Sequence, residues 1–197
     1  MATKLIFVRH GQTAWNSKMI YCGSTDICLN RKGRAQVEKL KKVFSRQEVN
    51  KIYCSNKKRA LETAKIIFGK EKIIKLTDLR EMHFGVFEGL TYKQIQKKYP
   101  GAYKKWLKDP FRATIPKGES IRDFKKRILR AVGKIMFANK GKTVAIVCHG
   151  GAISIFLTHI RKSKDFWKQI PSSASVSIVE CRNGKLKIKL FNDISHL

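Results

Sequence analysis

Short apolar runs alternate with longer amphipathic segments through most of the chain. The runs have the length of strands, and turn-forming residues bound them. They predict strands over Lys4 to Val8, Val49 to Cys54, Lys72 to Leu76 and Thr143 to Cys148. The segments between them repeat apolar residues about every 3.6 positions, which is typical of helices with one buried face. The predicted helices cover Arg31 to Phe44, a stretch after Ser55 or Asn56, Thr91 to Lys98, Ala102 to Leu107, Glu119 to Ala138 and Gly150 to His159.

This alternation predicts the fold class. Strands separated by helices form mostly parallel sheets with helices on both faces, so we expect a three-layer α/β/α sandwich with a mostly parallel central sheet. Thr143 to Cys148 is almost purely apolar, as in strands that are buried on both faces. Val176 to Cys181 and Lys185 to Phe191, joined by Asn183-Gly184, predict a hairpin near the end of the chain. Because no internal repeat or low-complexity linker interrupts the sequence, we expect one domain over residues 1–197.

Local signals refine the boundaries of these elements. Ser55 or Asn56 can cap the helix after the second strand, because both side chains accept hydrogen bonds from the free N–H groups of a helix start. Pro100-Gly101 is expected to separate two short helices, and Asp78 to Gly89 is expected to be irregular.

The charge balance changes the expected partners. The 43 Lys and Arg residues against 14 Asp and Glu residues give a formal net charge of +29. A surface of this kind attracts anions, including phosphorylated metabolites and nucleic acid. The lysines are spread along the whole chain and form no basic tail or recognition helix, which favours solvated lysine faces over a dedicated nucleic-acid surface. We therefore expect a small phosphorylated substrate and no specific nucleic-acid partner.

Cysteine usage and hydropathy bear on the cellular compartment. The five cysteines are scattered, odd in number and without a C-x-x-C pair, which argues against a disulfide framework and against a zinc ribbon. The longest apolar run, Ala152 to Leu157, is far too short to cross a bilayer. The N-terminus also lacks the long apolar segment of a signal peptide. These features predict a cytoplasmic protein with free thiols and no membrane partner.

Polar residues follow three of the predicted strands directly. Arg9-His10-Gly11 follows the first strand, Ser55 to Arg59 follows the second, and His149-Gly150-Gly151 follows the buried apolar strand. Ligands of open, mostly parallel sheets bind at the carboxyl ends of the strands. Side chains from three distant places in the sequence are therefore expected to meet at one edge of the sheet.

Phosphoryl transfer is the chemistry that suits these side chains. Arg9 and Arg59 carry guanidinium groups, whose paired N–H donors match the oxygens of a phosphate dianion. A neutral imidazole can attack phosphorus, so His10 is the candidate nucleophile. His149 can donate to the equatorial oxygens, on which negative charge builds during transfer. The glycines beside both histidines let backbone N–H groups approach the anion.

The leaving alkoxide needs a proton, which a carboxyl group can supply. Glu81 is our candidate, because it precedes a glycine-containing irregular segment. A nearby phosphate dianion should raise the pKa of this carboxyl and keep it protonated. The same group can then activate the water that opens the phosphohistidine. Asp78, Glu88 and Glu119 are competing carboxylates.

Several linked motifs carry a resemblance to a known family. They are Leu5 to Asn16 (LIFVRHGQTAWN), Tyr53-Cys54-Ser55, Arg59 to Ala64, Leu79-Arg80-Glu81, Glu88-Gly89 and His149-Gly150-Gly151. In these motifs, and in their order, the chain resembles the histidine phosphatase superfamily, which includes the cofactor-dependent phosphoglycerate mutases. The resemblance covers nearly the whole chain.

The resemblance implies a role for each candidate side chain. It implies a phosphohistidine at His10, with Glu81 as acid and base. It implies phosphate contacts from Arg9, Arg59 and His149, supported by Asn16, and it implies no metal and no other cofactor. From the residues alone, Asn16 could equally be a helix-terminating or turn residue.

The resemblance also bears on the reaction. Trp106, Asp109-Pro110 and Gly118-Glu119-Ser120 resemble the branch of α-ribazole phosphatases and broad-specificity phosphatases, although Cys22 replaces a glutamine that many relatives are expected to have. We expect a metal-independent phosphomonoesterase of the histidine acid phosphatase type, with α-ribazole 5′-phosphate as one candidate substrate. A cofactor-dependent phosphoglycerate mutase would use the same residues but usually carries a longer central insertion. An alternative of another class is a non-catalytic protein that binds RNA or another polyanion; the complete set of catalytic side chains argues against it.

Overall fold

The central element of the fold is a six-stranded sheet with the order β3-β2-β4-β1-β5-β6. We describe it from a computed structural model, which covers residues 1–163, 166 and 169–197. The strands are β1 (Thr3–Arg9), β2 (Lys51–Ser55), β3 (Ile73–Leu76), β4 (Thr143–Cys148), β5 (Val176–Arg182) and β6 (Lys185–Asp193). The first four strands pair in parallel, whereas β5 and β6 pair antiparallel. The sheet is therefore mostly parallel, as the alternation of strands and helices predicts.

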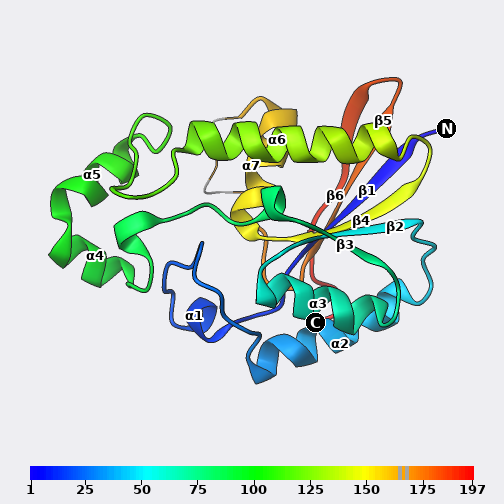
Figure 1. Ribbon diagram of the computed structural model, residues 1–197, viewed down its shortest axis with the longest axis horizontal. Coiled ribbons are helices and arrows are strands. Elements are labelled where there is room, and N and C mark those ends of the chain that lie inside the picture. The colour runs from blue at the N-terminus through cyan, green and yellow to red at the C-terminus, as the bar shows by residue number, and fades with distance from the viewer. Residues whose placement is uncertain (164–165, 167–168) are drawn as a thin grey trace.

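Helices cover both faces of this sheet (Figure 1). On one face lie α6 (Ile121–Ala138) and α7 (Gly150–Arg161), and on the other lie α2 (Arg31–Phe44) and α3 (Lys58–Phe68). Both faces of β1 carry apolar side chains that need such cover. Leu5 and Phe7 belong to the core cluster that includes α6 and α7, whereas Ile6 and Val8 belong to the cluster that includes α2 and α3. Successive side chains of a strand point to opposite faces, so an apolar run without polar interruption needs a helix layer on each. This confirms the expected three-layer sandwich.

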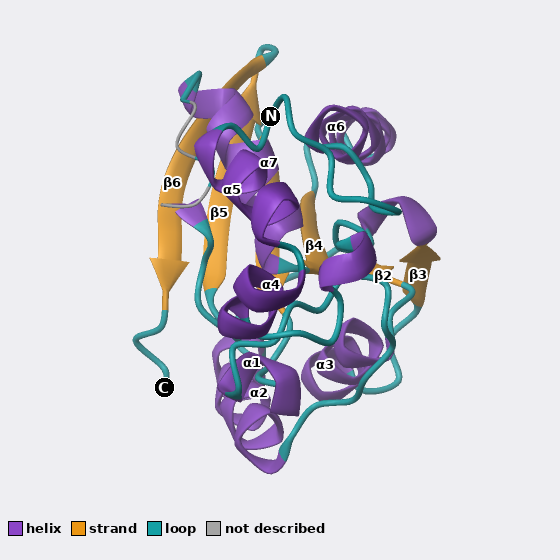
Figure 2. Ribbon diagram, turned by 90° about the vertical axis from the view of Figure 1, so that its left-hand side faces the viewer, coloured by secondary structure: helices purple, strands orange, loops and turns teal. Residues whose placement is uncertain are grey.

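Shorter helices gather beyond one end of the sheet. They are α1 (Ala14–Ser17), α4 (Tyr92–Lys98) and α5 (Pro100–Lys108), together with single 3₁₀ turns at Thr77–Leu79 and Gly85–Phe87. In Figure 2, α4 and α5 stand in front of the strands, and Figure 1 shows the same helices to one side of the sheet. β1 runs from the N-terminus towards this side, so the carboxyl ends of the parallel strands face these short helices and the irregular segment. No helix in the described part of the chain is long and apolar enough to cross a membrane.

Two local expectations are wrong, and both errors have a physical reason. The N-cap of α3 is Lys57, and neither Ser55 nor Asn56 caps this helix. Asp26, more than thirty residues earlier in the chain, accepts a hydrogen bond from the N–H of Lys58 at 2.7 Å instead. Pro100 and Gly101 lie inside α5 rather than before it, because proline suits the first turn of a helix, where its missing N–H costs no hydrogen bond.

The terminal hairpin has the turn that its sequence predicts. Asn183 and Gly184 have φ angles of +49° and +74°, in the left-handed region that Asn-Gly pairs adopt in two-residue hairpin turns. β6 forms an edge of the sheet, and its lysines Lys185, Lys187 and Lys189 are exposed. Charged side chains on an edge strand discourage pairing with another chain.

Candidate active site

The candidate site lies where β2, β4 and β1 end side by side in the sheet. These neighbouring strands deliver Ser55, His149 and His10 to the same edge. The rings of His10 and His149 have their centroids 5.2 Å apart and meet at 65°. Both histidines are buried, with exposed fractions of 4% and 0%. The structure thus brings together two histidines that are separated by most of the chain.

His10 has a defined tautomer and a neutral ring. Its Nδ1 lies 2.8 Å from the carbonyl oxygen of Gly11. Because a carbonyl can only accept, Nδ1 carries the hydrogen and Nε2 keeps its lone pair. Burial, followed by the charges of Arg59 and Arg9, lowers the pKa of His10 well below its ordinary value of 6.5. A neutral imidazole with a free Nε2 is the form that a nucleophile requires.

Arg59 is held rigidly although it is almost completely buried. Its two terminal nitrogens donate to the carbonyl oxygens of Thr25 and Gly23, each at 2.9 Å. Its Nε donates to Nδ1 of His149 at 3.3 Å. With an exposed fraction of 1%, the guanidinium has no carboxylate among these partners, so its positive charge stays available to an anion.

Arg9 places a second guanidinium beside the first. One terminal nitrogen donates to the carbonyl oxygen of Pro171. Its buried Nε has no acceptor among the described residues. Burial lowers the pKa of Arg9, Glu81 raises it and Arg59 lowers it further. A buried donor without a partner is costly in the free protein, which is consistent with a site that awaits an acceptor.

His149 is fixed by hydrogen bonds at both ring nitrogens. Nδ1 accepts from Arg59, and Nε2 lies 2.7 Å from Oγ of Ser55. Burial, followed by the charges of Arg59, His10 and Arg9, lowers the pKa of His149 well below 6.5. In this arrangement Nε2 donates to the serine hydroxyl. Ser55, expected as a helix cap, therefore serves as the partner of His149.

Glu81 lies beside the start of α7. Its Oε2 accepts from the N–H of Gly151 at 2.9 Å, and its Oε1 accepts from the N–H of Met82 at 2.9 Å. A Cβ on Gly151 would lie 2.4 Å from Oε1, so only glycine permits this approach. Burial raises the pKa of Glu81, and the two backbone hydrogen bonds and both arginines offset part of that rise. The carboxyl thus holds its proton to a higher pH than an exposed glutamate.

A cavity of about 230 Å³ opens next to these groups. Among its lining residues are Arg9, Asn16 and Glu81. The side-chain oxygen of Asn16 accepts from the N–H and the hydroxyl of Thr13, at 3.0 and 2.9 Å. The amide nitrogen is therefore the donor that Asn16 can offer to the cavity. Asn16 also occupies the N3 position of the capping box on α1, so it both caps this helix and lines the cavity.

The other residues around this cavity are mostly apolar or aromatic. They are Met19, Ile20, Tyr21, Cys22, Met82, Phe84, Gly150, Gly151, Phe166 and Ile170. Burial raises the pKa of Cys22 to about 11, so this free thiol is not a nucleophile near neutral pH. The sequence singled out Cys22 but not Tyr21, because an aromatic side chain in an irregular segment carries no signal that separates a core position from a cavity wall.

Of the competing carboxylates, Glu88 supports the loop that holds Arg59. It accepts from the N–H groups of Ser24 and Thr25 at 2.6 and 2.8 Å, and from the Thr25 hydroxyl at 2.6 Å. Burial pushes the pKa of Glu88 up, but the hydrogen bonds from Thr25, Ser24 and Phe84 outweigh it and lower the pKa. Glu88 therefore holds the segment whose carbonyl groups bind Arg59.

Glu119 and Arg127 support the segment that carries Glu81. Arg127 donates to both oxygens of Glu119, at 2.9 and 2.6 Å. The same guanidinium donates to the backbone carbonyls of Asp78, Arg80 and Glu81, at 2.8, 2.9 and 3.4 Å. Arg127 is not among the site residues that the sequence predicts. A charge on the apolar stripe of α6, three residues after Phe124, is the signal that could have found it.

Replacing Arg127 with alanine should destabilise the protein and displace Glu81. The change leaves Glu119 without its partner and three carbonyls without a donor, and breaking a buried pair in this way costs about 3–5 kcal/mol. Urea unfolding would measure the loss. Arg130→Ala is the matched control, because its side chain is 57% exposed and its pair with Asp78 contributes at most about 1 kcal/mol. Equal losses in the two variants would contradict the support role of Arg127.

Comparison with known proteins identifies relatives of the whole chain. Residues 5–194 match the family model described as histidine phosphatase superfamily (branch 1). The chain is 34% identical to phosphoglycerate mutase-like protein 4 of Arabidopsis thaliana, over 98% of this chain and 86% of that protein. It is 32% identical to the metal-independent phosphoserine phosphatase of the same plant, over 99% of this chain and 83% of that protein.

A solved structure shows the same architecture. The protein YhfR of Bacillus stearothermophilus superposes with a TM-score of 0.92 at 33% sequence identity, with 98% of each chain covered. The family model matches nearly the whole length of this chain, and the two plant relatives are identical to it at about a third of the aligned positions. The chain therefore belongs to the histidine phosphatase superfamily.

Proposed function

We propose that the chain hydrolyses phosphate monoesters of small metabolites through a phosphohistidine on His10. The observation that carries this proposal is the state of His10: a buried, neutral ring whose Nε2 lone pair is free, beside two guanidinium groups. Arg9 and Arg59 outnumber Glu81, the one buried carboxyl among the described residues, and this excess of positive charge suits a phosphate dianion.

The first step transfers the phosphoryl group to the protein. Nε2 of His10 attacks phosphorus, a P–N bond forms, and the bond from phosphorus to the ester oxygen breaks. Glu81 gives its proton to that oxygen, so the leaving group departs as an alcohol and Glu81 becomes a carboxylate. Arg9 and Arg59 bind the phosphoryl oxygens, on which charge accumulates in the transition state.

The second step returns the protein to its starting state. Water attacks phosphorus while the Glu81 carboxylate takes one of its protons. The P–N bond breaks, inorganic phosphate forms, and His10 regains its Nε2 lone pair. One carboxyl group thus acts as acid in the first step and as base in the second, in keeping with its raised pKa.

His149 can take part through its bond with Ser55. A serine hydroxyl both donates and accepts. If the Ser55 hydroxyl donates to Nε2 of His149, the ring hydrogen moves to Nδ1, which then donates to an oxygen of the bound phosphate. The hydrogen bond from Nε of Arg59 to Nδ1 of His149 would then break, and both groups would donate to the anion instead.

A panel of phosphorylated metabolites tests the proposal. It contains phosphoserine, in keeping with the name of one relative, 3-phosphoglycerate, and α-ribazole 5′-phosphate, which the sequence motifs suggest. Each compound is assayed for release of inorganic phosphate with and without a chelator. We expect turnover of at least one compound, unchanged by the chelator, because the side chains named above supply every step.

The same assay distinguishes the alternatives. A mutase would convert 3-phosphoglycerate to its isomer faster than it releases phosphate. A protein that only binds polyanions would turn over no compound. A rate that falls in chelator and returns with a divalent ion would contradict the metal-independent mechanism. Among the described residues, no three His, Cys, Asp or Glu side chains form a group that could hold a metal ion.

A further inference from the structure

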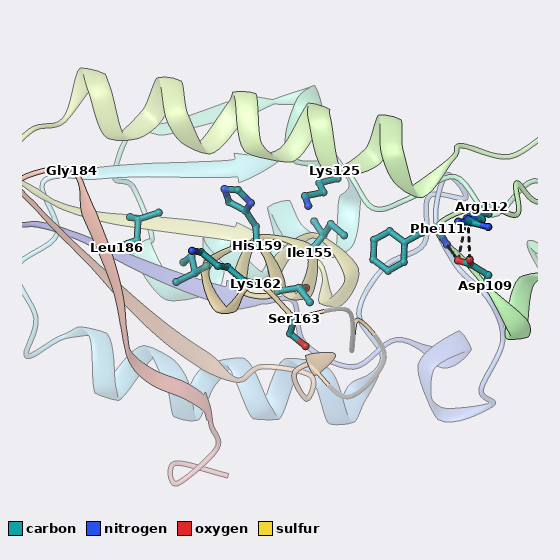
Figure 3. A pocket seen from close by; sticks show the side chains of 12 residues that line it. Asp109, Phe111, Arg112, Lys125, Ile155, His159, Lys162, Ser163, Gly184 and Leu186 are labelled. Atoms are coloured by element: carbon teal, nitrogen blue, oxygen red, sulfur yellow. Dashed lines mark hydrogen bonds and ion pairs between the residues drawn. The ribbon is translucent and has the colours of Figure 1, made fainter.

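A second and larger cavity lies away from the candidate active site. Its volume is about 770 Å³, within the range of small-molecule pockets. It opens between α6, the end of α7, the β5–β6 turn and the loop after α5 (Figure 3). The two cavities share no lining residue among those described: Gly150 and Gly151 at the start of α7 line the first, whereas Thr158 and His159 near its end line the second.

Positive charge gathers on the wall of this cavity. Lys125 comes from α6, Lys162 follows α7, and the imidazole of His159 adds a hydrogen-bond donor (Figure 3). The lining carboxylate Asp109 is already engaged, since it lies 3.6 Å from Nε of Arg112 and accepts from the N–H of Phe111. No ion pair is found for the ammonium groups of Lys125 and Lys162 within the described ranges. The described part of the wall therefore has a surplus of cations that an anion would satisfy.

The position of Lys125 is unusual for a lysine. It follows Ile121 by one helical turn, on the side of α6 that carries the buried Ile121, Phe124 and Ile128. Its side chain is half-buried, unlike that of the neighbouring Lys126, which is exposed. A lysine in this position packs its aliphatic stem against the apolar side of the helix and extends its ammonium group towards open space.

The rest of the lining is apolar. Ile155 is buried, Ile160 and Leu186 are half-buried, and Phe111 lies at the rim with 36% of its surface exposed. These side chains come from α7, β6 and the loop after α5 and frame the same space (Figure 3). An inorganic anion would leave this surface in contact with water. A ligand that carries a ring or an alkyl group would bury this apolar surface, which stabilises binding by roughly 25 cal/mol of free energy per Å² buried.

The end of α7 does not oppose an anion strongly. Free carbonyls at a helix C-terminus carry partial negative charge. Here Lys162 has a left-handed backbone, with φ at +53°, and its N–H donates to the carbonyls of His159 and Thr158. The N–H of Ser163 donates to the Thr158 carbonyl as well, at 3.1 Å. Backbone donors thus satisfy the carbonyls of Thr158 and His159 in the last turn.

We infer that this cavity binds an organic anion that joins a phosphate or carboxylate group to an aromatic or alkyl body. The anionic group contacts Lys125, Lys162 and His159, and the apolar body packs on Phe111, Ile155 and Leu186. The inference stands apart from the proposed phosphatase chemistry, because no catalytic candidate lines this cavity.

Chemical-shift mapping of the ¹⁵N-labelled protein tests the inference. The probe is 1-naphthylphosphonate, which carries both features and cannot be hydrolysed as an ester. Methylphosphonate keeps the anion without the ring, and 1-naphthol keeps the ring without the anion. We expect 1-naphthylphosphonate to shift the amides of Phe111, Lys125, Ile155 and His159 in addition to those around His10. At the same concentration, methylphosphonate should shift the His10 group alone.

A charge reversal supplies the matched comparison. Lys125→Glu should raise the Kd of the second site at least about tenfold, in line with the loss of a charge-assisted hydrogen bond. Lys126→Glu, the same change on the outer side of α6, should leave that Kd within about twofold. Lys125→Gln serves as a second variant if the glutamate disturbs folding, and its spectrum reports folding directly. The inference is overturned if the cavity amides do not shift, if both glutamate variants weaken binding equally, or if methylphosphonate binds there as tightly.

Discussion

His10→Ala is expected to reduce phosphate release by at least about 10⁴-fold on every substrate that the protein turns over. The variant removes the Nε2 lone pair that attacks phosphorus, and loss of a nucleophile costs this much or more in enzymes that form covalent intermediates. Neither Arg9 nor Arg59 can replace it, since a guanidinium keeps its protons and offers no nucleophile. Initial rates at saturating substrate measure the loss.

Substrate binding should survive in this variant. Arg59 is held by Thr25 and Gly23 rather than by His10, so the guanidinium stays in place. Wild-type protein that is quenched in alkali during turnover should carry a phosphoryl group on His10, detected by mass spectrometry, and the variant should carry none. His196→Ala, in the C-terminal tail, is the control of the same residue type. A His10→Ala protein with more than about a hundredth of wild-type activity would falsify the phosphohistidine mechanism.

Glu81→Gln is expected to lower the turnover of alkyl phosphates by about 10²–10⁴-fold, the usual contribution of a positioned acid or base. The amide keeps the size of the side chain but has no proton to give to the leaving oxygen. Aryl phosphates leave as stable phenolates, so their first step should lose much less. Rapid-quench measurement of the first turnover of a phenyl and an alkyl ester isolates that step and measures the difference. Glu71→Gln, at an exposed position, controls for the loss of one negative charge.

The same variant has a predicted pH signature. Burial raises the pKa of Glu81 above its ordinary value of 4.5, and the first step needs its protonated form. Wild-type turnover of alkyl esters should therefore fall as the pH rises through that raised pKa. Glu81→Gln cannot titrate, so its lower rate should stay flat over the same interval. A variant that keeps the alkaline decline, or whose first step slows equally on both esters, would assign the acid to another group.

Much of the fold follows from residues that are close together in the sequence. The helix Arg31–Phe44 and the strand Thr143–Cys148 have the bounds that their apolar spacing predicts. The turn at Asn183-Gly184 is equally local. Spacing and turn residues depend on neighbours within a few positions, so the sequence reports them directly.

Part of the site was also visible in the sequence, for a topological reason. His10 and His149 each follow an apolar run that ends at one edge of a parallel sheet. Because parallel strands place their carboxyl ends together, the two histidines had to converge, and their rings lie 5.2 Å apart. The sequence by itself thus determined which side chains gather at that edge.

Only the tertiary structure decided what supports those side chains. Three contacts join residues that are far apart in the chain. Asp26 accepts from the first turn of α3, Arg127 donates to the backbone of the Glu81 segment, and Ser55 pairs with His149. The neutral state of His10 likewise depends on burial and on two guanidinium charges that reach it through packing. Contacts of this kind arise from the distances between packed elements, and no periodicity or local motif encodes those distances.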